Sequence, residues 1–281
     1  MREPGVFSFL RGLWRILADR PRVPRSQQDN ALLREVLARR SVRRFADRPV
    51  PDDVLTAVLE AGRVAPSTVN LQTWSFVHFD ADRWRDLFAS PLPFGGRRAI
   101  VVLADVHRVG RVPLGFPDVP LCAYTVAVMN ASLAAMNMTI AAEALGLGSV
   151  MLSETGRTGF YDARHLVQTL QAPPGVWPLM TLVLGYPATG RPPMPPRLPL
   201  DAVAFTGAYR ETPQPVLDAW HEAMLAGYRA SSGGRLPSPA RSTTTTGDSA
   251  RPRRTCGRWC SAARTAHRSG PARIDPVGSA L

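Results

Sequence analysis

The chain has 281 residues, 45% of them hydrophobic, which is enough to bury a sizeable core in one large domain or two small ones. Its net charge of +12 sits at the two ends: residues 1–25 carry six arginines against two acids and residues 229–281 carry ten against two, which leaves 18 of each over residues 26–228. This neutral body argues against a nucleic-acid groove on the fold, although the basic ends could bind polyanions weakly. Three cysteines give no disulfide framework and indicate a reducing cytoplasm.

The two ends are predicted to be extensions of a central domain. Residues 5–18 have the pattern of an amphipathic helix, so contact with a membrane or partner surface is possible, but a packing or disordered extension is favoured. Two arginines interrupt its apolar run, which argues against a signal peptide. From residue 231 the chain is rich in Arg, Ser and Pro, so residues 229–281 are predicted to be a disordered tail. The folded domain is therefore expected over residues 26–228.

Apolar residues at helical spacing predict two short helices at the start of this domain. The first, capped by Asp29 or Asn30, delivers the chain to Arg39, and the second begins at Pro51 with acids in its first turn. Residues 65–70 favour a turn. The next segments are expected to be a strand at 74–79, a helix at 81–88, a buried strand at 99–105 and a Gly- and Pro-rich lid at 106–120.

Residues 124–142 carry no charge and are long enough to cross a bilayer. Polar residues among many alanines, Asn130 included, favour a buried central helix that ends at Gly146. The following segments are predicted to be a strand at 149–152, a helix at 157–170, a strand at 176–185, an extended proline-rich arm at 187–199 and a helix at 217–228. Because helices and strands alternate irregularly, an α+β fold with a mixed β-sheet flanked by helices is expected.

Two stretches have the composition of a binding site rather than of a core. The sequence RRSVRRF places four arginines around Ser41, which suits a phosphate group, and the chain has no lysine to share that role. The sequence PSTVNLQTW then gives a polar turn that leads into an aromatic strand. Taken singly, the first is more often a solvated face and the second a simple turn.

The order of four motifs resembles the FMN-dependent nitroreductase family. RRSVRRF is followed by PSTVNLQTW, then by ALGLGSVML at the end of an alanine-rich helix, then by LVLGYPATGRPPMPPRLPLDAV, so the resemblance covers about residues 32–209. It implies an α+β sandwich that forms an intertwined homodimer with two FMN molecules in the interface. Each half-site would combine the Arg-Ser motif of one chain with the Pro-Ser turn of the other.

The same resemblance implies roles for individual residues. Arg39 and Ser41 would contact the FMN phosphate and ribityl chain, with Arg40 supporting them. Arg43, where the family often has lysine, would lie at the pyrimidine edge of the flavin. Backbone amides near Ser153 and Glu154 would face the flavin nitrogen that receives hydride, although glycine is frequent at the second position. The remaining cofactor-binding residues would be Pro66, Ser67, Thr68, Asn70 and Gln72 in the turn and Arg197 in the arm.

The implied reaction is a ping-pong transfer in which NADPH or NADH reduces FMN and a nitroaromatic, quinone or similar small oxidant reoxidises it. The flavin carries this chemistry, so no catalytic side chain and no metal are expected. One alternative is a flavin-binding protein without turnover that sequesters FMN or senses redox state. Another is an enzyme that fragments FMN to dimethylbenzimidazole, whereas the absence of lysine argues against iodotyrosine dehalogenation.

Overall fold

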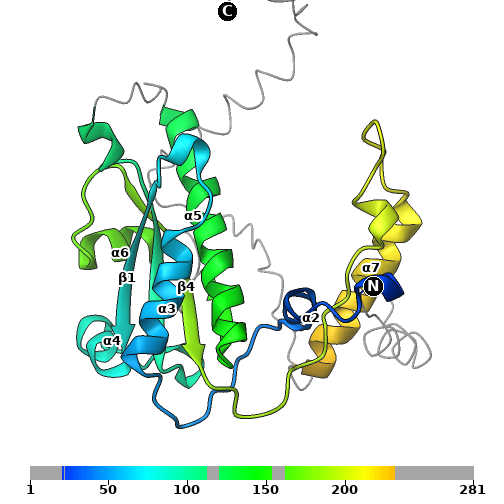
Figure 1. The fold of residues 1–281 in the computed structure, drawn as a ribbon, viewed down its shortest axis with the longest axis horizontal. Coiled ribbons are helices and arrows are strands. Elements are labelled where there is room, and N and C mark those ends of the chain that lie inside the picture. Colours follow the sequence, from blue (N-terminus) through cyan, green and yellow to red (C-terminus); the bar gives the residue numbers. More distant parts are fainter. Residues whose placement is uncertain (1–20, 22, 113–119, 154–161, 232–281) are drawn as a thin grey trace, which may run out of the picture. The chain divides into compact units, whose positions relative to one another are not determined.

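The computed structural model of the chain describes residues 21, 23–112, 120–153 and 162–231, with side chains up to residue 227. The predicted N-terminal helix, the predicted tail beyond residue 231 and Glu154 lie outside these residues, as does part of the predicted lid, whereas residues 229–231 belong to α7. In chain order the helices and strands are α2 (Ala31–Ala38), α3 (Asp52–Arg63), β1 (Trp74–Asp80), α4 (Ala81–Phe88), β2 (Arg98–Asp105), α5 (Pro120–Ala144), β3 (Gly148–Leu152), α6 (Asp162–Thr169), β4 (Val176–Gly185) and α7 (Gln214–Ser231) (Figure 1).

The four strands form one sheet in the order β1-β2-β4-β3, and every neighbouring pair is antiparallel. The α+β class is confirmed, but the prediction of a mixed sheet was wrong for these strands. Among the described residues, parallel pairing is limited to the single bridge between Ser41 and Ser149. Hydrophobic periodicity reports which faces of a strand are buried, not the direction of its neighbours, so the sequence pattern could not distinguish the two arrangements.

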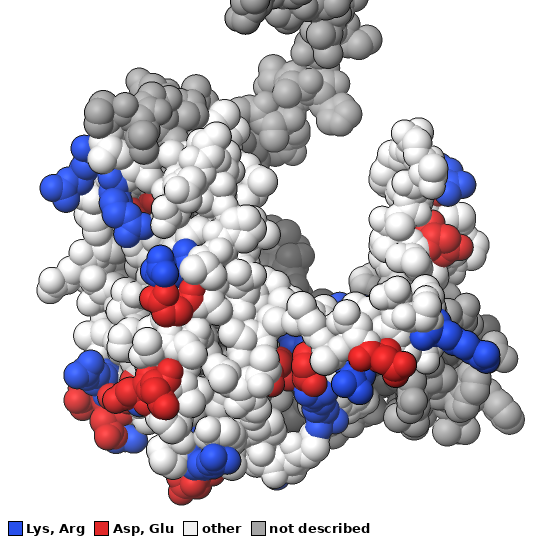
Figure 2. All heavy atoms as spheres, in the orientation of Figure 1, with Lys and Arg blue, Asp and Glu red and all other residues white. Residues whose placement is uncertain are grey.

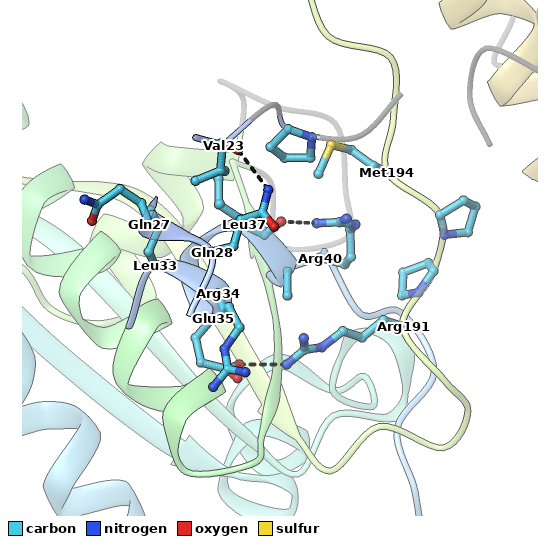
Figure 3. A pocket seen from close by; sticks show the side chains of 14 residues that line it. Val23, Gln27, Gln28, Leu33, Arg34, Glu35, Leu37, Arg40, Arg191 and Met194 are labelled. Atoms are coloured by element: carbon cyan, nitrogen blue, oxygen red, sulfur yellow. Dashed lines mark hydrogen bonds and ion pairs between the residues drawn. The ribbon is translucent and has the colours of Figure 1, made fainter. Parts of the chain in front are cut away.

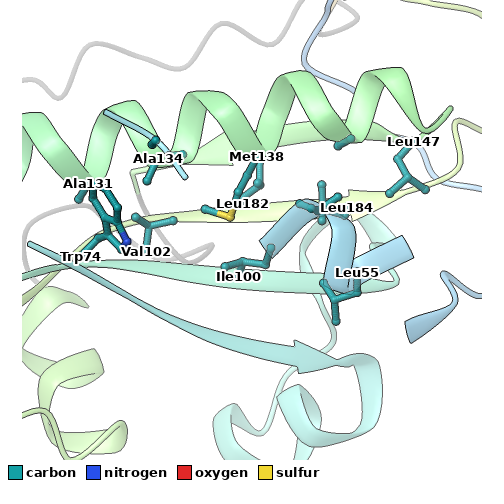
Figure 4. Close-up of a cluster of buried hydrophobic side chains, with 14 of the residues drawn as sticks. Leu55, Trp74, Ile100, Val102, Ala131, Ala134, Met138, Leu147, Leu182 and Leu184 are labelled. Carbon is teal, nitrogen blue, oxygen red and sulfur yellow. The ribbon is translucent and has the colours of Figure 1, made fainter. Parts of the chain in front are cut away.

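The sheet is covered on both faces. On one side α3 and α5 lie side by side, and Met138 of α5 packs in a cluster with Ile100 and Leu182 of the sheet (Figures 1 and 4). On the other side Trp84 of α4 packs in a second cluster with Val101. Successive residues of β2 thus enter opposite clusters, which explains why this strand is an unbroken apolar run.

The long helix α5 has the length and composition of a membrane span but packs as a core helix. Its buried residues include the polar Asn130, Thr139 and Glu143. The prediction of a buried central helix is therefore confirmed. A second set of its side chains remains exposed in the single chain, and we call these the α5 apolar stripe: Leu121, Met129, Leu133 and Met136.

Several predicted boundaries are confirmed. The side chain of Asn30 caps α2 by accepting a hydrogen bond from the Leu33 amide at 2.9 Å, and α3 begins directly after Pro51. The helix α7 is longer at both ends than the predicted 217–228. Residues 154–161, which include the predicted start of α6, are not described, and of the predicted lid only residues 106–112 and 120 are described.

Candidate functional site

The arginine-rich segment is held against the edge of the sheet. Ser41 bridges Ser149 of β3, and the Val42 amide donates to the Ser149 carbonyl at 2.9 Å. Further on, the Ala46 amide donates to the carbonyl of Tyr186, just after β4, at 2.8 Å. The segment therefore runs between β3 and the chain that leaves β4, which fixes the backbone from which the arginines project.

This close approach depends on glycine in the neighbouring strands. A Cβ atom at Gly148 would lie 2.6 Å from the side chain of Val42, and one at Gly185 would lie 2.9 Å from the ring of Phe45. Neither distance is compatible with an unstrained side chain. Gly148 of the GLGS motif and Gly185 of the LGY motif thus allow the arginine segment to dock.

Guanidinium groups from distant parts of the sequence gather beside this segment. Nη1 of Arg40 donates to the carbonyls of Leu37 and Arg39, both at 2.8 Å, at the end of α2. Burial, and then the positive charges of Arg39, Arg191 and Arg197, lower the pKa of Arg40. We call these four residues the arginine cluster.

Two glutamates partly balance the arginine cluster. Arg191 Nη2 lies 2.8 Å from Glu35 Oε2 (Figure 3) and 3.6 Å from Glu143 Oε2. The Glu143 side chain is only 6% exposed, and its Oε1 has no hydrogen-bond partner among the described residues. Burial raises the pKa of Glu143, against the opposing effect of Arg191 and Arg39.

The raised pKa of Glu143 predicts a specific pH dependence of stability. A carboxyl with a raised pKa in the folded state stabilises the fold below the ordinary pKa of glutamate, and this contribution is lost as the pH rises through the raised value. Glutamine does not titrate. We therefore expect Glu143→Gln to match the wild type in urea unfolding near pH 4 and to become increasingly more stable than the wild type toward pH 8.

Glu60 provides a matched control of opposite sign. It lies on the exposed surface of α3, and its hydrogen bond to Arg63 lowers its pKa. Glu60→Gln should therefore lose stability relative to the wild type above the ordinary pKa of glutamate. A difference between Glu143→Gln and the wild type that stays constant or shrinks between pH 4 and pH 8 would contradict the assignment.

A pocket of about 1080 Å³ opens between α2 and the proline-rich arm. Arg40 lines it from the end of α2, and Arg191 and Met194 line it from the arm (Figure 3). Part of the arginine cluster therefore faces an accessible space rather than the interior of the protein. An anion in this space would relieve the mutual repulsion of the guanidinium groups.

The predicted Pro-Ser turn has an unusual backbone. Its 3-10 segment covers Thr68–Asn70, and the Ser67 hydroxyl accepts a hydrogen bond from the Gln72 amide at 3.1 Å. Val69, Asn70 and Gln72 have φ angles of 41°, 58° and 49°, in the left-handed region that favours glycine. Non-glycine residues in such conformations persist only where their surroundings hold them, and they cluster at functional sites.

The structure adds two residues to this turn that sequence reasoning missed. Asn130 of α5 hydrogen-bonds both Thr68 and Thr73, and Nη2 of Arg108 donates to the Gln72 carbonyl at 2.9 Å. The only signal for Asn130 was its polarity in an apolar helix, which served as evidence against a membrane span. Arg108 lies at the start of the predicted lid and carries no recognisable pattern.

The structure brings the predicted residues together in two groups. The first group is part of the arginine cluster near Glu143 and contains Arg39, Arg40 and Arg197. The second group is the turn next to Asn130 and contains Ser67, Thr68 and Gln72. At 1.5 Å per residue, Asn130 and Glu143 are about 20 Å apart along α5.

Of the remaining predicted residues, Arg43 and Ser153 lie outside both groups, whereas Pro66 and Asn70 belong to the turn. The Arg43 side chain is exposed; its Nη1 is 3.5 Å from the Ser41 carbonyl, and its guanidinium is 5.9 Å from the centre of the Phe94 ring. Pro66 and Asn70 are exposed at the turn. Ser153 follows β3 and is exposed, at the edge of the undescribed residues that include Glu154.

Comparison with known proteins gives the same family along most of the fold. Residues 36–186 match the nitroreductase family. The chain is 30% identical over 196 residues to an FMN reductase [NAD(P)H] of Bacillus subtilis, covering 64% of this chain and 75% of that protein. It is 29% identical over 200 residues to an oxygen-insensitive NADPH nitroreductase of Salmonella typhimurium, covering 67% and 79%.

A solved structure supports the relationship. A putative nitroreductase of Desulfovibrio desulfuricans, determined in complex with FMN, is 27% identical with a TM-score of 0.52, and the match covers 65% of this chain and all of that one. The fold, the family match and the relatives agree. The chain belongs to the nitroreductase family of NAD(P)H-dependent flavin oxidoreductases.

Proposed function

We propose that this protein binds FMN and passes hydride from NADPH or NADH to a small oxidant such as a nitroaromatic or a quinone. The observation that carries the proposal is the arginine cluster, in which Arg40 has a lowered pKa beside three other arginines and lines an open pocket. A phosphate monoester, with close to two negative charges at neutral pH, suits such a group of donors. The donor set therefore fits the phosphate end of FMN.

The site is proposed to form between two copies of the chain. The arginine cluster and the Pro-Ser turn are about 20 Å apart along α5 in one chain, so a partner that supplies the missing half would complete each site. The α5 apolar stripe, with exposed fractions of 36–55%, offers a surface for that partner. A homodimer with two sites is the arrangement that accounts for both observations.

Each proposed residue has a physical task. FMN, when bound, supplies the redox chemistry of a ping-pong reaction. Arg39 and Ser41 would bind the phosphate and ribityl chain, with Arg197 beside them, and Arg40 would support Arg39 from the end of α2. Arg43 would place a fixed positive charge at the pyrimidine edge, where negative charge develops during reduction.

The exposed atoms of the Pro-Ser turn would contact the ring from the partner chain, and backbone amides near Ser153 and Glu154 would face its reactive edge.

The proposed function is tested by mixing the purified yellow protein with NADPH or NADH without oxygen. We expect the flavin absorbance near 450 nm to bleach and then to recover on addition of a nitroaromatic or a quinone. Colour that persists with both nucleotides would contradict the oxidoreductase and favour FMN binding without turnover. A colourless protein that does not take up added FMN would contradict the cofactor itself. Irreversible loss of flavin under oxygen would indicate FMN fragmentation.

Two further assignments remain proposals. We infer that residues 26–228 form the FMN-binding domain, with a basic extension at 1–25 and a tail at 229–281, and that the protein works in the cytoplasm. The composition of the ends and the small number of cysteines support them.

On the face shown in Figure 2, arginine and acidic side chains lie in small mixed groups over the described residues, which supports a small-molecule partner rather than a nucleic acid.

A further inference from the structure

We propose that Asn130 is a positioning residue that holds the Pro-Ser turn in the conformation needed to contact FMN. The proposal rests on the proposed function, because it assigns the turn to the flavin. It concerns a residue buried in α5 that would not touch the cofactor itself.

The side chain of Asn130 joins the two ends of the turn. Its Oδ1 accepts hydrogen bonds from the Thr68 amide at 3.1 Å and from the Thr68 hydroxyl at 3.3 Å. Its Nδ2 donates to the Thr73 hydroxyl at 2.8 Å. Asn130 is 1% exposed and Thr73 is fully buried, so water cannot readily replace these bonds.

The residues between these two anchor points are the strained ones. Val69, Asn70 and Gln72 all have positive φ angles, and Val69 is 84% exposed, so its side chain gains almost nothing from packing in this chain. Hydrogen bonds within the turn also restrain it, among them those from the Asn70 amide to the Ser67 carbonyl and from the Leu71 amide to the Thr68 carbonyl, and Arg108 donates to the Gln72 carbonyl. Asn130 is the described restraint that links both ends to the rigid core.

The packing of α5 against the sheet fixes the position of Asn130. Its neighbours Ala131 and Ala134 on α5 are fully buried in the core cluster against the sheet (Figure 4). The amide is therefore fixed by the packing of the helix rather than by the turn. The loss of this amide should change the turn more than the fold.

Three variants separate positioning from simple loss of stability. Asn130→Ala removes all three hydrogen bonds. Asn130→Asp keeps two oxygens in place, so the Thr68 amide and the Thr73 hydroxyl can both donate to it, and it should act as the conservative rescue. Asn137→Ala is the matched control, because Asn137 lies two turns further along α5 and donates at 3.1 Å to the Ala61 carbonyl, which is not part of the turn.

The measurements are the FMN dissociation constant, the rate of anaerobic reduction by NADPH, and backbone hydrogen exchange over residues 67–73. We expect Asn130→Ala to weaken FMN binding about tenfold, to slow reduction and to speed exchange in the turn. Asn130→Asp should stay within about threefold of the wild type, and Asn137→Ala within about twofold. If Asn130→Ala does not fold, Thr73→Val, which removes only the Thr73 hydroxyl, should show the same effects more weakly.

Two results would overturn the proposal. One is an Asn130→Ala or Thr73→Val protein with wild-type FMN binding, reduction and exchange. The other is an equal loss in Asn130→Ala and Asn137→Ala, since that would mean that stability alone is responsible. A wild-type protein that does not bind FMN would remove the proposed function, whereas exchange over residues 67–73 would still report whether Asn130 holds the turn.

Discussion

Replacing Arg43 with alanine is expected to slow the reduction of bound FMN by about a hundredfold and to weaken FMN binding. The proposed role of Arg43 is to stabilise the negative charge that the flavin ring acquires on reduction, and the effect should therefore be larger on the rate than on binding. Among the described residues, its guanidinium makes a long contact with the Ser41 carbonyl and a distant one with the Phe94 ring, so it can turn toward a ligand. Stopped-flow absorbance at 450 nm measures the rate.

Arg44 is the control for this experiment. It is the adjacent residue and is also exposed, so its loss changes the charge of the same segment by the same amount. The FMN bound to Arg44→Ala should be reduced at the wild-type rate. In Arg43→Lys, which keeps the charge, the rate of FMN reduction should return to most of the wild-type value. Equal rates for the wild type and Arg43→Ala would mean that the pyrimidine edge lies elsewhere.

Replacing Arg39 with alanine is expected to raise the FMN dissociation constant by about ten- to a hundredfold. A hydrogen bond to a charged group contributes about 1.5–3 kcal/mol, and each 1.4 kcal/mol is a factor of ten. Because the phosphate does not take part in the redox step, reduction of the fully loaded variant should remain close to the wild-type rate. Fluorescence quenching of FMN on binding, measured at several salt concentrations, gives the affinity and its salt dependence.

A surface arginine controls for the change in charge. Arg85 lies on α4 and pairs at 3.0 Å with Asp82, and both side chains are largely exposed, so Arg85→Ala should leave FMN binding unchanged. If Arg39→Ala and Arg85→Ala bind FMN equally well, the arginine cluster does not hold the phosphate. A variant that binds normally but is reduced slowly would place Arg39 near the ring instead.

The sequence contained enough information to place nearly all the helices and strands, because each has a local signal. Asn30 is a capping residue with an apolar helical pattern behind it, and Pro51 precedes two acids. β2 is an apolar run that two clusters enclose. The composition of α5 alone was ambiguous between a membrane span and a core helix, and its polar residues favoured the correct alternative.

Features that depend on tertiary contact could not be predicted in the same way. The antiparallel order of the sheet is set by which strands meet, and no residue type records it. Arg191 was not identified, although it belongs to the arginine cluster and pairs with Glu35, because the arm meets α2 only in the folded chain. Asn130 was visible as a polar residue, but its partners Thr68 and Thr73 are 62 and 57 residues away.

The proposed division of each site between two chains is tested most directly by mixing two variants that each bind FMN poorly. Arg39→Ala weakens the phosphate half, and Ser67→Tyr would block the turn half with a bulky ring. Dimers that contain one chain of each kind can be isolated with two affinity tags, and their FMN content can be measured by absorbance. A shared site predicts one FMN per mixed dimer, because one site carries both defects and the other carries none. If the mixed dimer binds no more FMN than either variant alone, both halves come from the same chain, and the proposal of a site shared between two chains is wrong.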